Sequence, residues 1–367
     1  MRGRAEGTGR MTTTCLGCGL ACDDIAVTVR DGRILEAVNA CDLGVRWFGD
    51  GTVPTLARIG GAGVTVPTAL AEAARVLTTA KRPLVYLAAE LSISAQREAC
   101  ALADVLGAML DTVTPSELIL PIQERGRCSA TFGELRYRAD IVVFWGVDPD
   151  HAYPRLRSRY LPDRAGVQFI SVDLSVEAAA LTRAAILGHG MTPLAERLVK
   201  GKYVAIVVDG EQRPEYIEAL LALTEALNGP TRAALMILRG GGNRVGADSV
   251  LTWQTGYPKA IDFARGAPRY CPYDPPEFDA ALIVGSSASV PESLRLTNIP
   301  TVIIGPRASE NLLAAAVAID TGIAGIHDGG TAVRTDELPL PLRPALVGVV
   351  PETAATVREL TALVTQP

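Results

Sequence analysis

The segment CLGCGLACDDIAVTVRDGRILEAVNAC spans residues 15–41 and carries four cysteines in the spacing C-x2-C-x3-C-x18-C: Cys15, Cys18, Cys22 and Cys41. Four thiolates hold an iron–sulfur cluster, and one tight loop commonly supplies three of them. Apolar residues alternate on both sides of Asp31-Gly32, which predicts a β-hairpin that returns Cys41 to the loop. We therefore predict a 4Fe–4S cluster on these cysteines. A structural zinc ion is the competing interpretation, and free thiols are a third.

The composition indicates an ordinary α/β protein. The 367 residues carry a formal net charge of −5 and only 5% aromatic side chains, so a surface for nucleic acid or anionic lipid is not expected. The longest apolar runs, such as residues 141–147, are too short to span a bilayer. No apolar signal core follows the N-terminal arginines, and the seven cysteines do not resemble a disulfide framework. Both features predict a cytoplasmic protein.

Beyond the cysteine segment, the chain alternates between apolar runs and helical stripes. This pattern predicts parallel sheets that are covered on both faces by helices. We expect a cluster domain at residues 1–60, a discontinuous α/β domain at 61–137 plus 195–367, and an inserted α/β domain at 138–194. The predicted helices include 70–77, 99–106 and 215–227. The predicted strands are 84–89, 141–146, 167–172, 203–208, 234–238, 280–284 and 301–304.

Several predicted strands end in turns rich in Gly, Asp and Ser. Asp148 and Asp173 each follow such a strand, and nucleotides and phosphates bind at the carboxyl ends of strands in open α/β sheets. These turns are also common in α/β proteins without a ligand. The glycine-rich run at residues 239–246, which contains Asn243, has neither of the standard nucleotide-binding spacings.

Four stretches carry a resemblance to a known family. They are Asp23-Asp24-Ile25 after the cysteines, the run from Phe132 to Asp140, the run from Val143 to Arg155, and Leu251-Thr-Trp-Gln-Thr-Gly-Tyr-Pro258. In this order they resemble the B subunit of formylmethanofuran dehydrogenase, a molybdopterin oxidoreductase, over nearly the whole chain. The resemblance implies a small N-terminal iron–sulfur domain followed by two Rossmann-like α/β domains with mainly parallel sheets, without the C-terminal barrel domain of the superfamily.

The resemblance also implies a redox cofactor: a molybdenum or tungsten atom between two pterin guanine dinucleotides, with a cysteine or selenocysteine ligand. Asp148, Asp173 and Asn243 are the candidate cofactor-binding residues. Counting back from Gln123, the ligand position falls at Thr114 and the family's catalytic histidine at Pro115. A hydroxyl is a poor ligand for a soft metal centre, and proline transfers no proton. No cysteine lies between Cys100 and Cys128. We expect Cys100 to pack inside a helix, and Cys128 is the one cysteine that could replace the missing metal ligand.

Further positions depart from the family. Only His151 remains of a histidine-rich segment, with Tyr153 and Leu156 where histidines are expected, and Leu174-Ser175 replaces a Pro-Arg pair. For His189 and His327 we expect loop or surface roles. No catalytic residue is therefore assigned to this chain.

This combination resembles the B subunit of the bacterial formyltransferase/hydrolase complex of one-carbon metabolism. The resemblance implies a scaffold whose A, C and D partners include the hydrolase and transferase subunits. The four cysteines are unexpected in a scaffold without electron transfer, although a cluster can persist as a structural staple. The alternatives are the B subunit of an active formylmethanofuran dehydrogenase with a Mo/W-pterin centre, and an unrelated α/β protein with a zinc knuckle.

Overall fold

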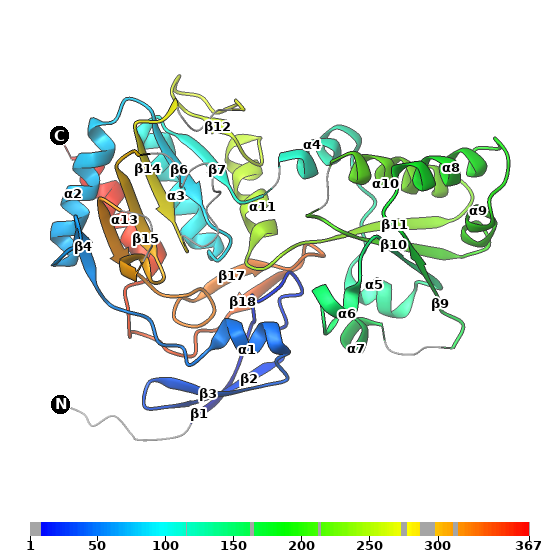
Figure 1. Cartoon of the computed structure of the whole chain (residues 1–367), viewed down its shortest axis with the longest axis horizontal. Helices are drawn as coiled ribbons and strands as arrows, with labels where there is room; N and C mark the ends of the chain where they lie inside the picture. Colours follow the sequence, from blue (N-terminus) through cyan, green and yellow to red (C-terminus); the bar gives the residue numbers. More distant parts are fainter. Residues whose placement is uncertain are drawn as a thin grey trace.

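The computed structural model shows two α/β lobes side by side and a small antiparallel unit below their junction (Figure 1). No helix among the described residues is both long and apolar enough to cross a membrane. The structure describes residues 9–114, 116–161, 165–211, 214–272, 277–286, 298–310 and 315–366.

The N-terminal unit is a three-stranded antiparallel sheet in the order β1-β2-β3, followed by helix α1. Its elements are β1 (Gly9–Thr13), β2 (Ile25–Arg30), β3 (Arg33–Val38) and α1 (Asp42–Phe48). Asp31 and Gly32 both have positive φ, of 50° and 71°, as a two-residue turn with left-handed geometry requires. The predicted hairpin is confirmed.

The larger lobe contains a nine-stranded sheet in the order β13-β12-β7-β6-β14-β15-β16-β4-β5. Its central strands are parallel, and the strands at both edges pair antiparallel. The strands are β4 (Ala57–Ile59), β5 (Ala62–Val64), β6 (Pro83–Leu87), β7 (Met109–Thr112), β12 (Ile261–Asp262), β13 (Arg269–Tyr270), β14 (Ala280–Val284), β15 (Thr301–Gly305) and β16 (Val317–Asp320). The helices are α2 (Val66–Thr79), α3 (Ile93–Leu106), α11 (Arg244–Thr255) and α13 (Thr353–Val364).

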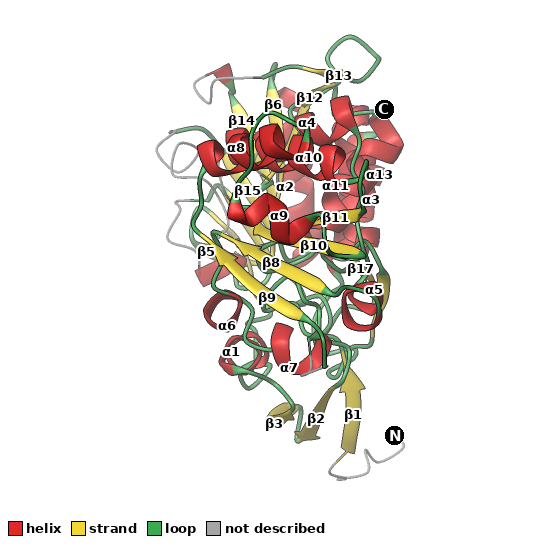
Figure 2. Ribbon diagram, turned by 90° about the vertical axis from the view of Figure 1, so that its right-hand side faces the viewer, coloured by secondary structure: helices red, strands yellow, loops and turns green. Residues whose placement is uncertain are grey.

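The smaller lobe contains a wholly parallel four-stranded sheet, β11-β10-β8-β9, with helices on both faces (Figure 2). Its strands are β8 (Ile141–Trp145), β9 (Gln168–Val172), β10 (Tyr203–Asp209) and β11 (Arg232–Leu238). Its helices are α4 (Ser116–Arg125), α5 (Phe132–Tyr137), α6 (Pro149–Ala152), α7 (Leu156–Tyr160), α8 (Val176–Ile186), α9 (Pro193–Leu198) and α10 (Pro214–Leu227).

This smaller lobe extends beyond the inserted domain that the sequence suggested. That domain was expected to end at residue 194, but β10 pairs with β8 in parallel and β11 pairs with β10. The boundary at 194 therefore lies inside one sheet. Local apolar patterns identify strands, but only long-range pairing decides which strands share a sheet.

The mixed α/β architecture with parallel sheets is confirmed, and every strand predicted from an apolar run is present within one to two residues. The central strands β6, β8 and β14 are buried along their whole length, as their continuous apolar runs predict. The Rossmann-like detail and the iron–sulfur assignment stay predictions.

A hairpin of β17 (Gly330–Val333) and β18 (Pro339–Leu342) lies between the lobes, and a short 3-10 helix, η3 (Ala308–Glu310), follows β15. The hairpin's turn contacts the smaller lobe: the guanidinium of Arg334 lies 5.1 Å from the ring centre of Phe132, and the Phe132 amide donates to Asp336 over 2.8 Å. The turn of the hairpin therefore packs against α5 of the smaller lobe.

Candidate functional site

The four cysteines of the N-terminal unit surround one small cavity, called here the cysteine cavity. Cys15, Cys18 and Cys22 lie in the loop between β1 and β2, and Cys41 is the residue before α1. All four line the cavity, together with Ile25, Ala40, Leu43, Gly44 and Arg155. The hairpin thus returns Cys41 to the loop, as its sequence predicted.

Hydrogen bonds close the three-cysteine loop tightly. The Cys15 amide donates to the Cys22 carbonyl over 2.9 Å, and the Ala21 amide donates to the Cys18 carbonyl over 3.2 Å. The Gly17 amide donates to the Sγ atom of Cys15 over 3.3 Å. Amide donors to sulfur stabilise thiolates and tune iron–sulfur clusters.

Burial disfavours the charged thiolate form of these cysteines when no cation is bound. Cys15, Cys18 and Cys22 are each less than a tenth exposed, and burial raises the pKa of Cys18 to about 12 and that of Cys15 still higher. Without a cation they would stay protonated at neutral pH, and all seven cysteines of the chain are free thiols. No group of three or more His, Cys, Asp or Glu side chains among the described residues is arranged so that it could hold a metal ion in this conformation. Metal binding at the cysteines stays a prediction.

Two arginines of the smaller lobe adjoin the cysteine cavity. Arg155 lies directly before α7 and lines the cavity, and Arg159 follows one helical turn later. The Arg155 guanidinium donates to both carboxylate oxygens of Asp24, over 2.7 Å each. Arg159 pairs with Asp23 and with Asp24. This network joins α7 to the segment that follows Cys22.

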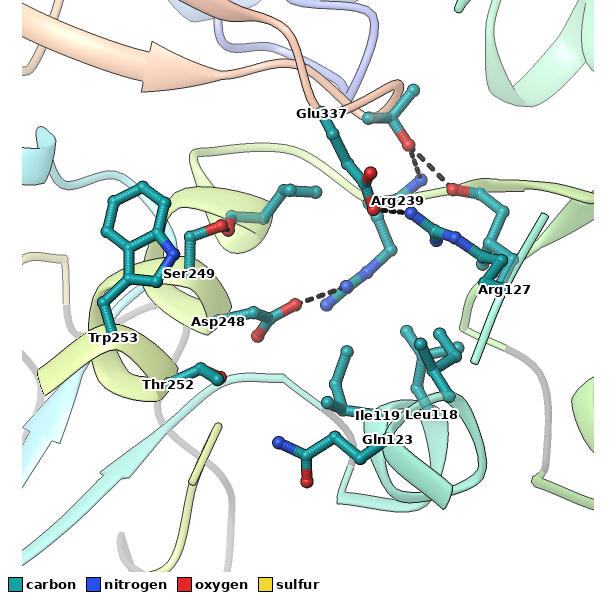
Figure 3. Close-up of a pocket in the computed structure, with 14 residues that line it drawn as sticks. Leu118, Ile119, Gln123, Arg127, Arg239, Asp248, Ser249, Thr252, Trp253 and Glu337 are labelled. Atoms are coloured by element: carbon teal, nitrogen blue, oxygen red, sulfur yellow. Dashed lines mark hydrogen bonds and ion pairs between the residues drawn. The ribbon is translucent and has the colours of Figure 1, made fainter. Parts of the chain in front are cut away.

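A second cavity, of about 250 Å³, lies between the lobes and is called here the interlobe pocket (Figure 3). Arg239, directly after β11, pairs with Asp248 of α11 over 2.6 Å, and both side chains are at least nine-tenths buried. Arg127 pairs with Glu337 on another side of the pocket. Burial and repulsion from Arg239 lower the pKa of Arg127 to about 10. Trp253 of α11 lines the pocket and is 72% exposed, so it stands at the solvent side.

Thr114, the predicted family ligand position, lies next to the interlobe pocket and is almost completely buried. Its hydroxyl accepts a hydrogen bond from Nη2 of Arg239 over 3.2 Å, and its carbonyl accepts one from Nζ of Lys259 over 3.2 Å. Both oxygens are therefore engaged within the chain. Pro115, the predicted histidine position, lies outside the described residues.

Neither Cys100 nor Cys128 lines the interlobe pocket. Cys128 lines a separate cavity against α10 and not the interlobe pocket, so the structure does not support it as a replacement ligand. Cys100 is buried in α3 and packs in the core of the larger lobe, as expected from its helical context.

The three candidate cofactor-binding residues lie in different surroundings. Asp148 and Asp173 are both exposed at the carboxyl ends of β8 and β9. Asn243 is fully buried before α11: its amide nitrogen donates to the Leu91 carbonyl over 2.9 Å, and its Oδ1 atom accepts from the Val333 amide over 2.7 Å. Asn243 therefore joins neighbouring segments, and a pterin contact by any of the three stays a prediction.

The histidines are only partly as expected. His151 and His189 lie at the surface, in α6 and in the turn after α8. His327 also lies in a turn, but it is buried: its Nδ1 atom accepts from the Ile323 amide and its Nε2 atom lies 2.8 Å from the Gly51 carbonyl. A surface role for His327 is wrong, because the imidazole satisfies two backbone groups between the N-terminal unit and the larger lobe.

Sequence reasoning missed the arginines of both sites. Arg155 and Arg159 are four positions apart, a spacing that places two side chains on one helix face, but nothing local indicates that this face meets the cysteines. Arg239 was noted only as the start of a glycine-rich run. Its partner Asp248 lies in the next helix, and their pairing follows from the fold.

Comparisons with known proteins support the family resemblance. No family model matches the chain. The B subunit of tungsten-containing formylmethanofuran dehydrogenase 2 from Methanocaldococcus jannaschii is 28% identical, over 92% of this chain and 94% of that protein. The B subunit of the formyltransferase/hydrolase complex Fhc from Methylorubrum extorquens is also 28% identical, over 71% of this chain and 84% of that protein.

A solved structure shows a similar fold. A chain in the X-ray crystal structure of the formyltransferase/hydrolase complex (FhcABCD) from Methylorubrum extorquens in complex with methylofuran has a TM-score of 0.72 and 23% identity, over 84% of this chain and 98% of that chain. Over most of its length the chain is therefore similar in sequence to B subunits of tungsten-containing formylmethanofuran dehydrogenase 2 and of the formyltransferase/hydrolase complex Fhc.

Proposed function

We propose that the chain is the B subunit of a formyltransferase/hydrolase-type complex in one-carbon metabolism, and that it serves as a scaffold for A-, C- and D-type subunits without a redox step of its own. Its relatives are B subunits of complexes that act on formyl carriers, by their names. The observation that carries the proposal concerns Thr114: the position that the resemblance predicts for the family's metal ligand holds a hydroxyl that is buried and hydrogen-bonded to Arg239.

The residues around Thr114 do not fit a metal between two pterin dinucleotides. A soft, high-valent metal is bound by a thiolate, and the oxygen of Thr114 is both hard and already engaged. The neighbouring interlobe pocket has about 250 Å³, whereas pockets for a single drug-sized ligand are commonly about 300–1,000 Å³. Two dinucleotides are much larger than one such ligand. We therefore derive no redox step at this pocket.

The cysteine cavity, in contrast, offers the donor types that a 4Fe–4S cluster takes. Four thiols line one cavity, three from a loop with an amide donor to sulfur and one from the end of a hairpin. Bound there, a cluster would supply one-electron chemistry or a structural cross-link, and Cys15, Cys18, Cys22 and Cys41 would hold it. The seven free thiols also support our proposal of a reducing, cytoplasmic location.

A second candidate is the B subunit of an active formylmethanofuran dehydrogenase. It is favoured by one observation: the similarity to the tungsten-containing relative extends over 92% of the chain, against 71% for the Fhc relative. The two candidates differ in metal content, because only the dehydrogenase needs molybdenum or tungsten.

The deciding experiment is anaerobic purification of the tagged chain from its source organism. We expect A-, C- and D-type subunits to co-purify, iron but no stoichiometric Mo or W, formyl transfer and formate release, and no formylmethanofuran-dependent dye reduction. Robust dye reduction with stoichiometric Mo or W would overturn the scaffold proposal and favour the dehydrogenase. A stable monomer without partners would contradict both.

A further inference from the structure

The wall of the cysteine cavity comes from two parts of the molecule that are far apart in sequence. The N-terminal unit supplies the four cysteines, and the smaller lobe supplies Arg155. Arg159 extends from the same face of α7 and, like Arg155, has a side chain only 18% exposed. Arg155 lines the cavity itself, and Arg159 pairs with Asp23 and Asp24, the two residues that follow Cys22.

Two carboxylates fix these guanidinium groups in place. Arg155 and Asp24 form a two-pronged pair with both distances at 2.7 Å, and Arg159 reaches Asp23. A planar guanidinium can serve a carboxylate with one edge while its remaining N–H groups stay available to a second acceptor, which an ammonium on a flexible stem does less well. Asp23 and Asp24 directly follow Cys22, so the acceptors that orient the arginines belong to the cysteine segment itself.

We propose that Arg155 and Arg159 are the outer charge partners of the four-cysteine site, and that Asp24 orients them there. The inference rests on the proposed 4Fe–4S cluster. The two arginines stabilise the negative charge of four thiolates and raise the reduction potential of the cluster. They also tie cluster loading to the docking of α7, and hence of the smaller lobe, onto the N-terminal unit.

The physical basis is charge in a poorly solvated site. Four thiolates around a cluster leave a net negative charge, and one-electron reduction adds a further negative charge. Cations held close by, where water is largely excluded, stabilise the reduced state more than the oxidised state. Loss of a guanidinium must therefore lower the potential, and loss of an acidic neighbour must raise it. If the same residues had a purely structural role, their loss would not shift the reduction potential in opposite directions.

The test measures iron content and the midpoint potential of the anaerobically purified complex by spectroelectrochemical titration. The variants are Arg155→Gln, Arg155→Lys and Asp24→Asn. Arg157→Gln is the matched control, because Arg157 lies on α7 between the two arginines but pairs with Asp150 over 2.8 Å and stacks on Phe144. It carries the same loss of charge on the same helix and does not line the cysteine cavity.

We expect Arg155→Gln to lower the ratio of reduced to oxidised cluster at least tenfold at a fixed electrode potential, a shift of about 59 mV for a one-electron couple. Asp24→Asn should shift the ratio in the opposite direction, and Arg155→Lys should stay near the wild type while retaining less iron. Arg157→Gln should match the wild type. If Arg155→Gln does not fold, a rise in the potential of Asp24→Asn beside an unshifted Arg157→Gln still decides the question.

Two failures are distinguishable. Wild-type protein with zinc or no metal would overturn the cluster and this inference together. Wild-type protein with about four irons per chain, but with Arg155→Gln and Asp24→Asn indistinguishable from Arg157→Gln, would overturn only the inference and leave the cluster in place.

Discussion

The cysteine cavity and the interlobe pocket share a backbone contact but differ in their chemistry. The Gly19 amide, within the cysteine loop, donates to the Arg239 carbonyl over 3.1 Å. On one side of that contact, four soft donors line a cavity and none forms a disulfide. On the other side, a hydroxyl and a buried Arg239–Asp248 pair occupy the space with hard polar groups that bond to each other.

The two sites therefore offer different donor chemistry, although they adjoin each other in one fold. Donors that remain unpaired keep a site open to a metal, whereas donors that satisfy one another close it. This contrast supports our proposal of a cluster site in the cysteine cavity without a redox site beside it. Four experiments test this contrast between the two sites.

The largest effect is expected from Cys18→Ala. Removal of one of four thiolates should abolish the broad visible absorption and the content of about four irons per chain, because a cubane cluster needs a ligand on each iron. The measurement is iron analysis with absorption spectroscopy on anaerobically purified complex. Cys128→Ala is the control, since Cys128 does not line the cysteine cavity. Unchanged iron content in Cys18→Ala, or one zinc ion in the wild type, would contradict the proposed contrast between a cysteine cavity that binds a cluster and an interlobe pocket that binds no metal.

In the interlobe pocket, stability rather than metal content should respond. Asp248→Ala leaves Arg239 as an uncompensated buried charge, and such a change costs about 3–5 kcal/mol in the free energy of unfolding. The double variant Arg239→Met, Asp248→Leu should cost less than the sum of the single changes, as a denaturation series would show. Additive losses would mean that Arg239 and Asp248 do not stabilise each other as a pair. Their bonding to each other would then not be what keeps a metal out of the pocket.

Gly19→Ala probes the contact between the two sites. A Cβ atom at Gly19 would lie 2.2 Å from the Arg239 carbonyl oxygen, so the backbone of one segment must shift, at a cost of about 1–3 kcal/mol. Iron content should fall together with thermal stability. Gly63→Ala is the control, because its Cβ atom would meet nothing within 4 Å. Equal behaviour of the two variants would show that the sites are independent.

The smallest effect concerns pH. Burial lowers the pKa of His327, which bonds to the Gly51 carbonyl at the edge of the N-terminal unit. The unfolded chain then binds more protons than the folded chain at pH values between the folded pKa and about 6.5. Stability should therefore fall as pH decreases through that window. His327→Gln should remove this part of the slope in thermal unfolding at several pH values, and an unchanged slope would contradict the assignment.

The local elements of the fold could be predicted because their signals are local. Alternation in the segment from Ile25 to Val38 specified the hairpin, and the continuous apolar run at β8 specified a buried strand. The extent of the smaller lobe could not be predicted, because β10 joins β8 by pairing across more than sixty residues of intervening chain. Hydrophobic pattern identifies a strand but does not specify its partner.

The amino-acid sequence alone specifies the four cysteines, the turn that returns the last of them to the first three, and the absence of a thiolate at Thr114, because residue identity and short-range periodicity are local properties. The packing of the lobes is what places Arg155 and Arg159 against the cysteine segment and bonds Arg239 to both Asp248 and Thr114. Long charged side chains carry no sequence signal of their partners. Their pairing is fixed by burial, which makes an unpaired charge costly once the lobes have packed together.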